Sequence, residues 1–125
     1  VRSTFYYANL SGADLSGANL SVASLMGAMM RGANLHRASC VGTNFYRAVL
    51  QNANLAEADL REALLRMADL SHASLEDANL FRANLAEACL DYAQLKGANF
   101  KKTNLWHVNL GHLILSDPSL GPAPA

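Results

Sequence analysis

Large apolar residues recur at every fifth position along almost the whole chain. From Phe5 to Leu115 there are 23 such positions, and 18 of them hold Leu. The residue two places earlier is small, and it is Ala in 18 of the 23 repeats. The residue between the two is Asn or Asp in 13 repeats. The repeating unit is therefore Ala, then Asn or Asp, then Leu, then two variable residues, and no insertion shifts its phase.

A period of five excludes the simple secondary structures. On an α-helix five residues advance about 140° past a full turn, so the Leu side chains would spread around the whole surface. On a flat strand successive Leu side chains would alternate between the two faces, because the side-chain period is two. A chain that turns a corner every five residues avoids both problems, since Ala and Leu are two apart and point the same way. Four such corners close a coil with Ala and Leu inside.

This geometry makes definite predictions about single residues. We expect inward-pointing side chains in one coil at Leu55, Leu60, Leu65 and Leu70. Ala58 and Ala78 should be fully buried and tightly packed, because a small residue lets neighbouring backbones approach closely. Glycine occupies the last repeat position six times, where a corner needs a positive φ. These glycines are Gly12, Gly17, Gly27, Gly32, Gly42 and Gly97.

The registered units, A-(N/D)-L-x-x, resemble those of the pentapeptide-repeat family over nearly the whole chain. The resemblance implies an all-β fold, a right-handed quadrilateral (four-sided) parallel β-helix solenoid of five to six coils with 20 residues each. At a strand spacing of ~4.8 Å the rod would be ~27 Å long. We expect this domain to span residues 1–115, and the Pro-rich segment 116–125 to be a disordered tail or linker.

Composition and charge exclude several classes of function. The chain has ten basic and ten acidic residues and no net charge, so it lacks the basic footprint expected for nucleic-acid binding. No apolar run approaches the roughly 20 residues of a membrane span, and no secretory signal opens the chain. Because the sequence starts at Val1 rather than Met, we expect that a preceding segment was removed. The cytoplasm is the default expectation for its location.

The residues that could carry chemistry are explained by the repeat. His72 and His112 lie two coils apart with Tyr92 between them, which favours ring stacking over a shared metal ion. Cys40 occupies an inward Leu position and Cys89 an outward one, so they should not form a disulfide. No Ser-His-Asp or Cys-His arrangement departs from the repeat register. We therefore predict that the protein is not an enzyme, with no catalytic, cofactor-binding or metal-binding residue and no cofactor.

Residues 20 apart should stack on one face of the rod, so the outward positions can be sorted into columns. Most outward residues are polar, but one face of the first four coils is apolar and rich in Met and Tyr. We name this set the apolar strip and predict that it is solvent-exposed and binds a partner. The apolar strip comprises Tyr6, Met26, Met29, Tyr46, Val49, Leu64 and Met67. Scattered surface apolarity, which is common, is the alternative interpretation.

Opposite charges also fall 20 apart in this register. We expect stacked surface ion pairs worth under ~1 kcal/mol each. The expected pairs are Arg37 with Glu57, Glu62 with Arg82, and Glu76 with Lys96.

Two hypotheses of function follow. The first is a structural or protein-interaction scaffold, whose partner is another protein or a second copy docked end to end or face to face. The second is a DNA mimic that binds DNA gyrase, a function the resemblance implies because the quinolone-resistance proteins belong to the family. Mimicry needs an acidic stripe along the rod, but eight of the ten acids lie within residues 51–95, interleaved with Arg61, Arg66 and Arg82. We therefore favour the scaffold.

Overall fold

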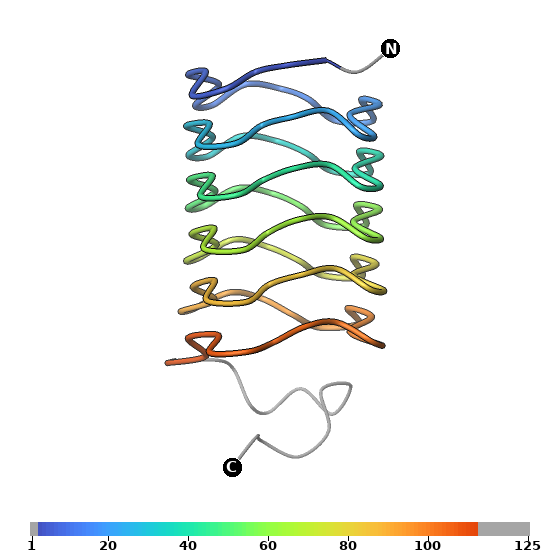
Figure 1. The fold of residues 1–125 in the computed structure, drawn as a ribbon, viewed down its shortest axis with the longest axis vertical. Helices are drawn as coiled ribbons and strands as arrows, with labels where there is room; N and C mark the ends of the chain where they lie inside the picture. The colour runs from blue at the N-terminus through green and yellow to red at the C-terminus, as the bar shows by residue number, and fades with distance from the viewer. Residues whose placement is uncertain (1–2, 113–125) are drawn as a thin grey trace.

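The chain winds as a four-sided coil whose successive turns stack into a rod (Figure 1). A computed structural model describes residues 3–112, which make between five and six coils. Each outward residue in the middle of a side forms a parallel bridge with the residue 20 positions later, from Thr4 with Ser24 to Cys89 with Asn109. The coil of 20 residues expected from the sequence is therefore present.

The sides and edges of the rod are named here by their bridged residues and turns. Side 1 carries Thr4, Ser24, Asn44, Leu64, Asn84 and Asn104, and side 2 carries Asn9, Met29, Val49, Asp69, Cys89 and Asn109. Side 3 carries Asp14, Asn34, Asn54, Ser74 and Gln94, and side 4 carries Asn19, Ser39, Asp59, Asn79 and Asn99. Two-residue turns join the sides, at 6–7 and every 20 residues onward for edge 1–2, and likewise from 11–12, 16–17 and 21–22 for edges 2–3, 3–4 and 4–1.

The sides are too short to form extended strands. Residues 3–112 contain no helix and no strand longer than a single bridged residue. A corner every five residues leaves three extended residues for each side, so the continuous strands that the term parallel β-helix suggests are reduced to one bridge per side. None of these described residues belongs to a helix that could cross a membrane.

Backbone hydrogen bonds hold the coils to one another at every side. The amide of Leu10 donates to the carbonyl of Met29 at 2.7 Å, and the amide of Asn34 donates to Ala13 at 2.8 Å. The corner itself is closed by a bond from the amide of Ala13 to the carbonyl of Leu10, 3.0 Å long. These bonds pair most of the backbone polar groups between coils. The interior can therefore exclude water even though the rod has no long strands.

The Asn or Asp of each repeat stabilises the turn that follows it. The side-chain oxygen of Asn54 accepts the amide of Ala56 at 3.0 Å, and that of Asn9 accepts the amide of Ser11 at 3.2 Å. This is the Asx turn, in which a short polar side chain takes the place of a backbone acceptor. The sequence preference at this position therefore has a local structural cause.

Every corner from 6–7 to 106–107 has a left-handed residue at its second turn position. The six expected glycines have φ between 65° and 74°, which confirms that prediction. The same conformation occurs at fifteen non-glycine residues, including the β-branched Val22 at φ 54°. Left-handed backbone costs a non-glycine residue on the order of 1 kcal/mol or more, so coil-to-coil bonding enforces this corner whatever its residue.

The interior is a column of Ala and Leu. Leu55, Leu60 and Leu65 are 0% exposed, as is Leu70, and Ala58 and Ala78 are 1% exposed, which confirms the expected inward orientation. Cys40 also belongs to this interior column and is buried as predicted. Desolvation raises the pKa of its thiol to about 12. Each buried Leu contributes roughly 1.5–3 kcal/mol, so this column is the main source of stability.

Two parts of the sequence interpretation lie outside the described residues. These are the last repeat unit, which ends at Leu115, and the Pro-rich segment 116–125.

Candidate functional site

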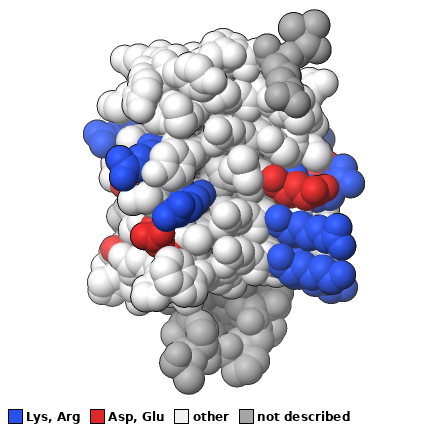
Figure 2. Space-filling model, viewed as in Figure 1, with Lys and Arg blue, Asp and Glu red and all other residues white. Residues whose placement is uncertain are grey.

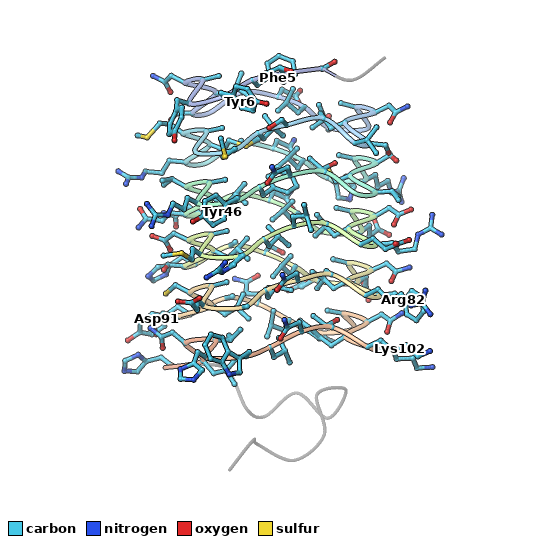
Figure 3. All side chains as sticks on the ribbon, viewed as in Figure 1. Phe5, Tyr6, Tyr46, Arg82, Asp91 and Lys102 are labelled. Carbon is cyan, nitrogen blue, oxygen red and sulfur yellow. The ribbon has the colours of Figure 1, made fainter. Side chains whose placement is uncertain are left out.

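The apolar strip crosses one edge of the rod instead of lying on a single face. Leu64 lies on side 1, and Met29 and Val49 lie on side 2. The remaining four members, Tyr6, Met26, Tyr46 and Met67, are turn residues of edge 1–2 between those sides. In Figure 3 the labelled Tyr6 and Tyr46 mark this edge. The structure therefore brings all seven residues to one edge and its two neighbouring sides, within the first four coils.

The exposure of the apolar strip is uneven. Tyr6, Met29 and Leu64 are exposed, at 56%, 41% and 46%. Met26, Tyr46, Val49 and Met67 are half-buried rather than fully exposed as expected, because stacked side chains cover one another. The Tyr46 hydroxyl, for example, lies 3.8 Å from the Met67 sulfur.

Tyr7 lies beside the apolar strip on edge 1–2 and extends this surface. Its side chain is 72% exposed, and its ring lies over Gly27 in the next coil. A β-carbon built at Gly27 would be only 2.4 Å from the Tyr7 ring. The ring can pack here only because Gly27 has no side chain. A glycine 20 residues after an aromatic turn residue is the sequence signal that could have identified this contact.

A ladder of three rings runs along edge 2–3 in the last coils. The ring centroids of His72 and Tyr92 are 4.8 Å apart, and those of Tyr92 and His112 are 4.6 Å apart with nearly parallel planes. This confirms the predicted stacking. His112 also contacts the Asp91 carboxylate at 2.8 Å, and its hydrogen bond lowers the pKa of Asp91.

Of the three predicted ion pairs, one is present. Arg37 and Glu57 are 2.9 Å apart, and hydrogen bonds from Arg37 and His36 lower the pKa of Glu57. The pairs Glu62–Arg82 and Glu76–Lys96 are wrong, because residues 3–112 contain no such contact.

A local contact takes the place of one of the two missing pairs. Arg82 instead extends over the ring of Phe81, 5.2 Å from its centroid, and points outward at edge 4–1 beside Lys102 (Figure 3), on the side of the rod where Figure 2 shows basic side chains. The exposed guanidinium gains more from a neighbouring ring and water than from ordering a distant carboxylate.

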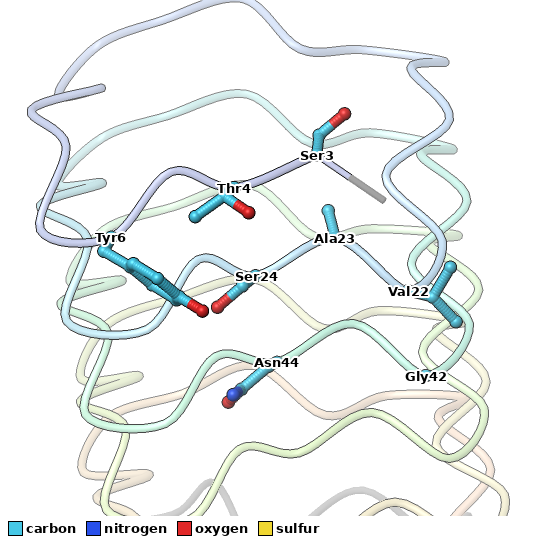
Figure 4. Close-up of a pocket in the computed structure, with 8 residues that line it drawn as sticks. All are labelled: Ser3, Thr4, Tyr6, Val22, Ala23, Ser24, Gly42 and Asn44. Atoms are coloured by element: carbon cyan, nitrogen blue, oxygen red, sulfur yellow. The ribbon is translucent and has the colours of Figure 1, made fainter. Parts of the chain in front are cut away.

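A groove of about 340 Å³ lies on side 1 near the first coils (Figure 4). Its lining includes Ser3, Thr4 and Ser24, with Tyr6 at one end and Val22 at the other. The Ser24 hydroxyl oxygen is buried and has no hydrogen-bond partner among the described residues. The described residues of the lining include no histidine, carboxylate or amine, so none of them can act as a general base on these hydroxyls.

The part of the chain that the structure describes contains no group of three His, Cys, Asp or Glu side chains placed to hold a metal ion. Cys40 and Cys89 are both free, as expected from their separation along the rod.

A four-sided coil with an Ala and Leu core defines a repeat solenoid. The family described as "Pentapeptide repeats" matches this chain with eight copies over residues 3–39, 43–80 and 78–117. The chain therefore belongs to the pentapeptide-repeat family.

Solved structures of the same family resemble the chain. The pentapeptide-repeat protein alr5209 from Nostoc PCC 7120 is 31% identical, with a TM-score of 0.68, covering 78% of this chain and 84% of its own. Rfr23 from the cyanobacterium Cyanothece 51142 is 30% identical, with a TM-score of 0.61 and coverage of 86% and 80%. HetL from Nostoc sp. PCC 7120, a protein involved in heterocyst differentiation regulation, is 27% identical, with a TM-score of 0.58 and coverage of 88% and 73%. No curated protein sequence matches the chain.

Proposed function

We propose that this chain is a non-enzymatic protein-interaction scaffold, built on a right-handed four-sided β-helix, whose partner docks on the apolar strip across edge 1–2. The observation that carries the proposal is the exposure of Tyr6, Met29 and Leu64 at outward positions. At the mid-side position that Met29 and Leu64 occupy, the residues elsewhere on the rod are mostly Asn, Ser and Asp. Clustered exposed apolar side chains favour association, and Met and aromatic residues are enriched in interface cores.

The rigidity of the rod supports this role. The strip residues project from a backbone that is bonded to the coils above and below, as in the bond from Met29 to Ala8 at 2.8 Å and from Met30 to Val49 at 2.7 Å. A surface fixed in this way loses little conformational entropy when a partner binds, so more of the contact energy appears as affinity. Repeat solenoids present extended binding surfaces for the same reason.

The absence of assembled catalytic groups in the described residues supports a role without chemistry. Most outward Asn and Asp side chains are occupied by turns, as Asn44 is with the amide of Tyr46 at 2.9 Å. The described residues that line the groove on side 1 include no base for its hydroxyls.

Charge mimicry of DNA is the weaker alternative. Glu57, Glu76 and Asp77 lie together at edge 3–4, diagonally opposite the apolar strip. Basic residues interrupt this acidic group above and below, because Arg37 and Lys96 occupy the same edge one coil away. A duplex mimic needs a negative stripe along the whole rod, and this edge does not supply it.

The experiment is a comparison of three variants in capture of binding proteins from a lysate of the source organism. Met26→Lys with Tyr46→Lys should abolish capture of a partner retained by the wild-type chain, because charge is introduced into the centre of the apolar strip. Phe81→Lys is the matched control, since Phe81 is a half-buried aromatic at the same turn position of edge 4–1. Loss of binding in Glu57→Gln with Glu76→Gln and Asp77→Asn, with binding kept in the double Lys variant, would instead support charge mimicry.

A further inference from the structure

On side 2 and its two edges, basic and acidic residues are segregated along the rod. The first three coils carry Arg31 and Arg47 there and no acid. The last three coils carry Asp69, Glu87 and Asp91 and a single base, Arg66. Neither Arg31 nor Arg47 forms an ion pair within residues 3–112. One half of this surface is therefore positive by two charges and the other half negative by two.

The size of the side chains on edge 2–3 also differs between the two halves of the rod. The first two coils have glycines at its second turn position, Gly12 and Gly32, and a β-carbon built on either would have nothing within 4 Å. The last three coils have His72, Tyr92 and His112 at the equivalent position, and these rings form the exposed ladder. One half of this edge therefore has no side chains at the second turn position of its first two coils, and the other half carries large aromatic rings.

We propose that side 2 is a self-complementary interface on which a second copy of this chain docks face to face, with the two rods antiparallel. A twofold axis that lies in the interface between the third and fourth coils brings the first coil opposite the sixth and the second opposite the fifth. Arg31 then faces Asp91 of the second copy, and the ring of Tyr92 enters the space above Gly32. A parallel arrangement would instead bring Arg31 opposite edge 1–2 of the same coil of the second copy, away from Asp91.

The same operation places the members of the apolar strip on side 2 and edge 1–2 in the interface, while Leu64 on side 1 lies outside it. Met29 on side 2 faces Cys89 of the second copy, and Tyr6 on edge 1–2 faces Trp106. Trp106 is 59% exposed, so burying it against a Tyr ring would remove a large apolar surface from water. This proposal rests on the proposed function and deepens it by naming the partner.

The area of side 2 indicates how strong the proposed dimer should be. Six levels at ~4.8 Å, and a width of about five residues at ~3.3 Å when one turn residue at each edge is counted with the three of the side, give a face of roughly 450–500 Å². Two such faces bury roughly 900–1,000 Å², which is at the lower end of specific interfaces and suits a weak, reversible dimer. The charge pairs should make its association sensitive to salt.

Sedimentation velocity of the full chain over a wide concentration range tests the proposal. The wild-type chain, 13.4 kDa as a monomer, should shift towards a dimer at high concentration in low salt. Arg31→Glu and Asp91→Arg should each weaken self-association at least about ten-fold, because each places like charges opposite one another at both symmetry-related contacts. Lys101→Glu, at edge 4–1, is the matched charge-reversal control and should leave self-association unchanged.

The decisive arm is a mixture of the two charge-reversed chains. Arg31 and Asp91 of one chain lie three coils apart, roughly 14 Å along the rod, so they cannot restore each other within a chain. The mixture should form a heterodimer even though neither variant associates alone, because both contacts are again between opposite charges. Circular dichroism of each variant checks that it remains folded.

Two results would overturn the second-copy proposal. One is a wild-type chain that stays monomeric throughout the concentration range, and the other is a wild-type dimer whose mixture of variants stays monomeric. Neither result decides whether another protein binds the apolar strip, since the Met26→Lys with Tyr46→Lys comparison reports that separately.

Discussion

Replacing Ala78 with Leu tests the packing of the core at a fully buried position. Ala78 is 1% exposed, and its carbonyl accepts the amide of Asn99 in the next coil at 2.9 Å. Its amide closes the preceding corner on Leu75 at 3.0 Å. The backbone on both sides of the methyl group is therefore fixed, and an isobutyl group has no open space to enter.

The magnitude follows from the cost of over-packing. Forcing a larger side chain into a well-packed interior costs typically 1–3 kcal/mol, because neighbours leave their preferred rotamers and the backbone shifts. For a domain of this size each kcal/mol lowers Tm by roughly 4 °C. We therefore expect Tm to fall by roughly 4–12 °C, with little change in the far-ultraviolet circular dichroism spectrum below the transition.

The control is the same substitution at an outward position. Ala56→Leu changes a half-exposed turn residue of edge 3–4, where the added carbons can reach solvent, so it should alter stability by less than about 0.5 kcal/mol. Thermal and urea unfolding of both variants give the comparison. Equal stability of the wild-type chain and Ala78→Leu would show that this column does not face inward, and the reasoning would fail.

Three further predictions use other parts of the core and surface. Leu60→Ala, which empties a fully buried site, should destabilise the fold by about 2–5 kcal/mol in urea unfolding. Iodoacetamide at mild alkaline pH should label Cys89 in the folded chain but leave Cys40 unlabelled until denaturant is added, because burial raises the pKa of the Cys40 thiol to about 12; prompt labelling of both would contradict the buried assignment. Arg61→Gln should return the pKa of Asp59 towards its ordinary value, since the Arg61 hydrogen bond lowers it. The stability from that lowered pKa is present above pH ~4 and is lost as the pH falls through it, so urea titrations of the two proteins should converge in acid.

The repeat made the fold predictable because one physical requirement recurs in every unit. A Leu two residues after an Ala can point inward only if the chain turns every five residues, and the buried Leu55 and Ala58 show that outcome. The ring ladder of edge 2–3 was predictable for the same reason, since a register of 20 places Tyr92 directly between two histidines.

Side-chain partners at the surface were less predictable. A register of 20 puts Glu62 in the same column as Arg82, but it does not say whether the two long side chains lean towards each other. Arg82 lies over Phe81 instead. Exposed pairs differ from their alternatives by less than about 1 kcal/mol, so local neighbours decide them.

The left-handed corners were only partly predictable from glycine. Six corners carry glycine, but Val22 adopts the same conformation at φ 54° with no sequence signal of its own. The stacking of coils imposes the corner geometry, and the cost of each strained residue is spread over a rod of many bonded turns. The position of the apolar strip was also only partly predictable. The register of 20 grouped its members into columns, but it did not show that they lie around a common edge.

Site-specific photo-crosslinking tests the central claim, that edge 1–2 and side 2 form the interaction surface, most directly. A benzophenone amino acid would replace Tyr46 in one variant and Phe81 in the other. The two positions match in turn register and half-burial, and each has an arginine over its ring, Arg47 at 5.5 Å and Arg82 at 5.2 Å. Irradiation in a lysate of the source organism should link a protein or a second copy of the chain to the Tyr46 variant, and leave the Phe81 variant unlinked. Crosslinks from Phe81 with none from Tyr46 would contradict the account.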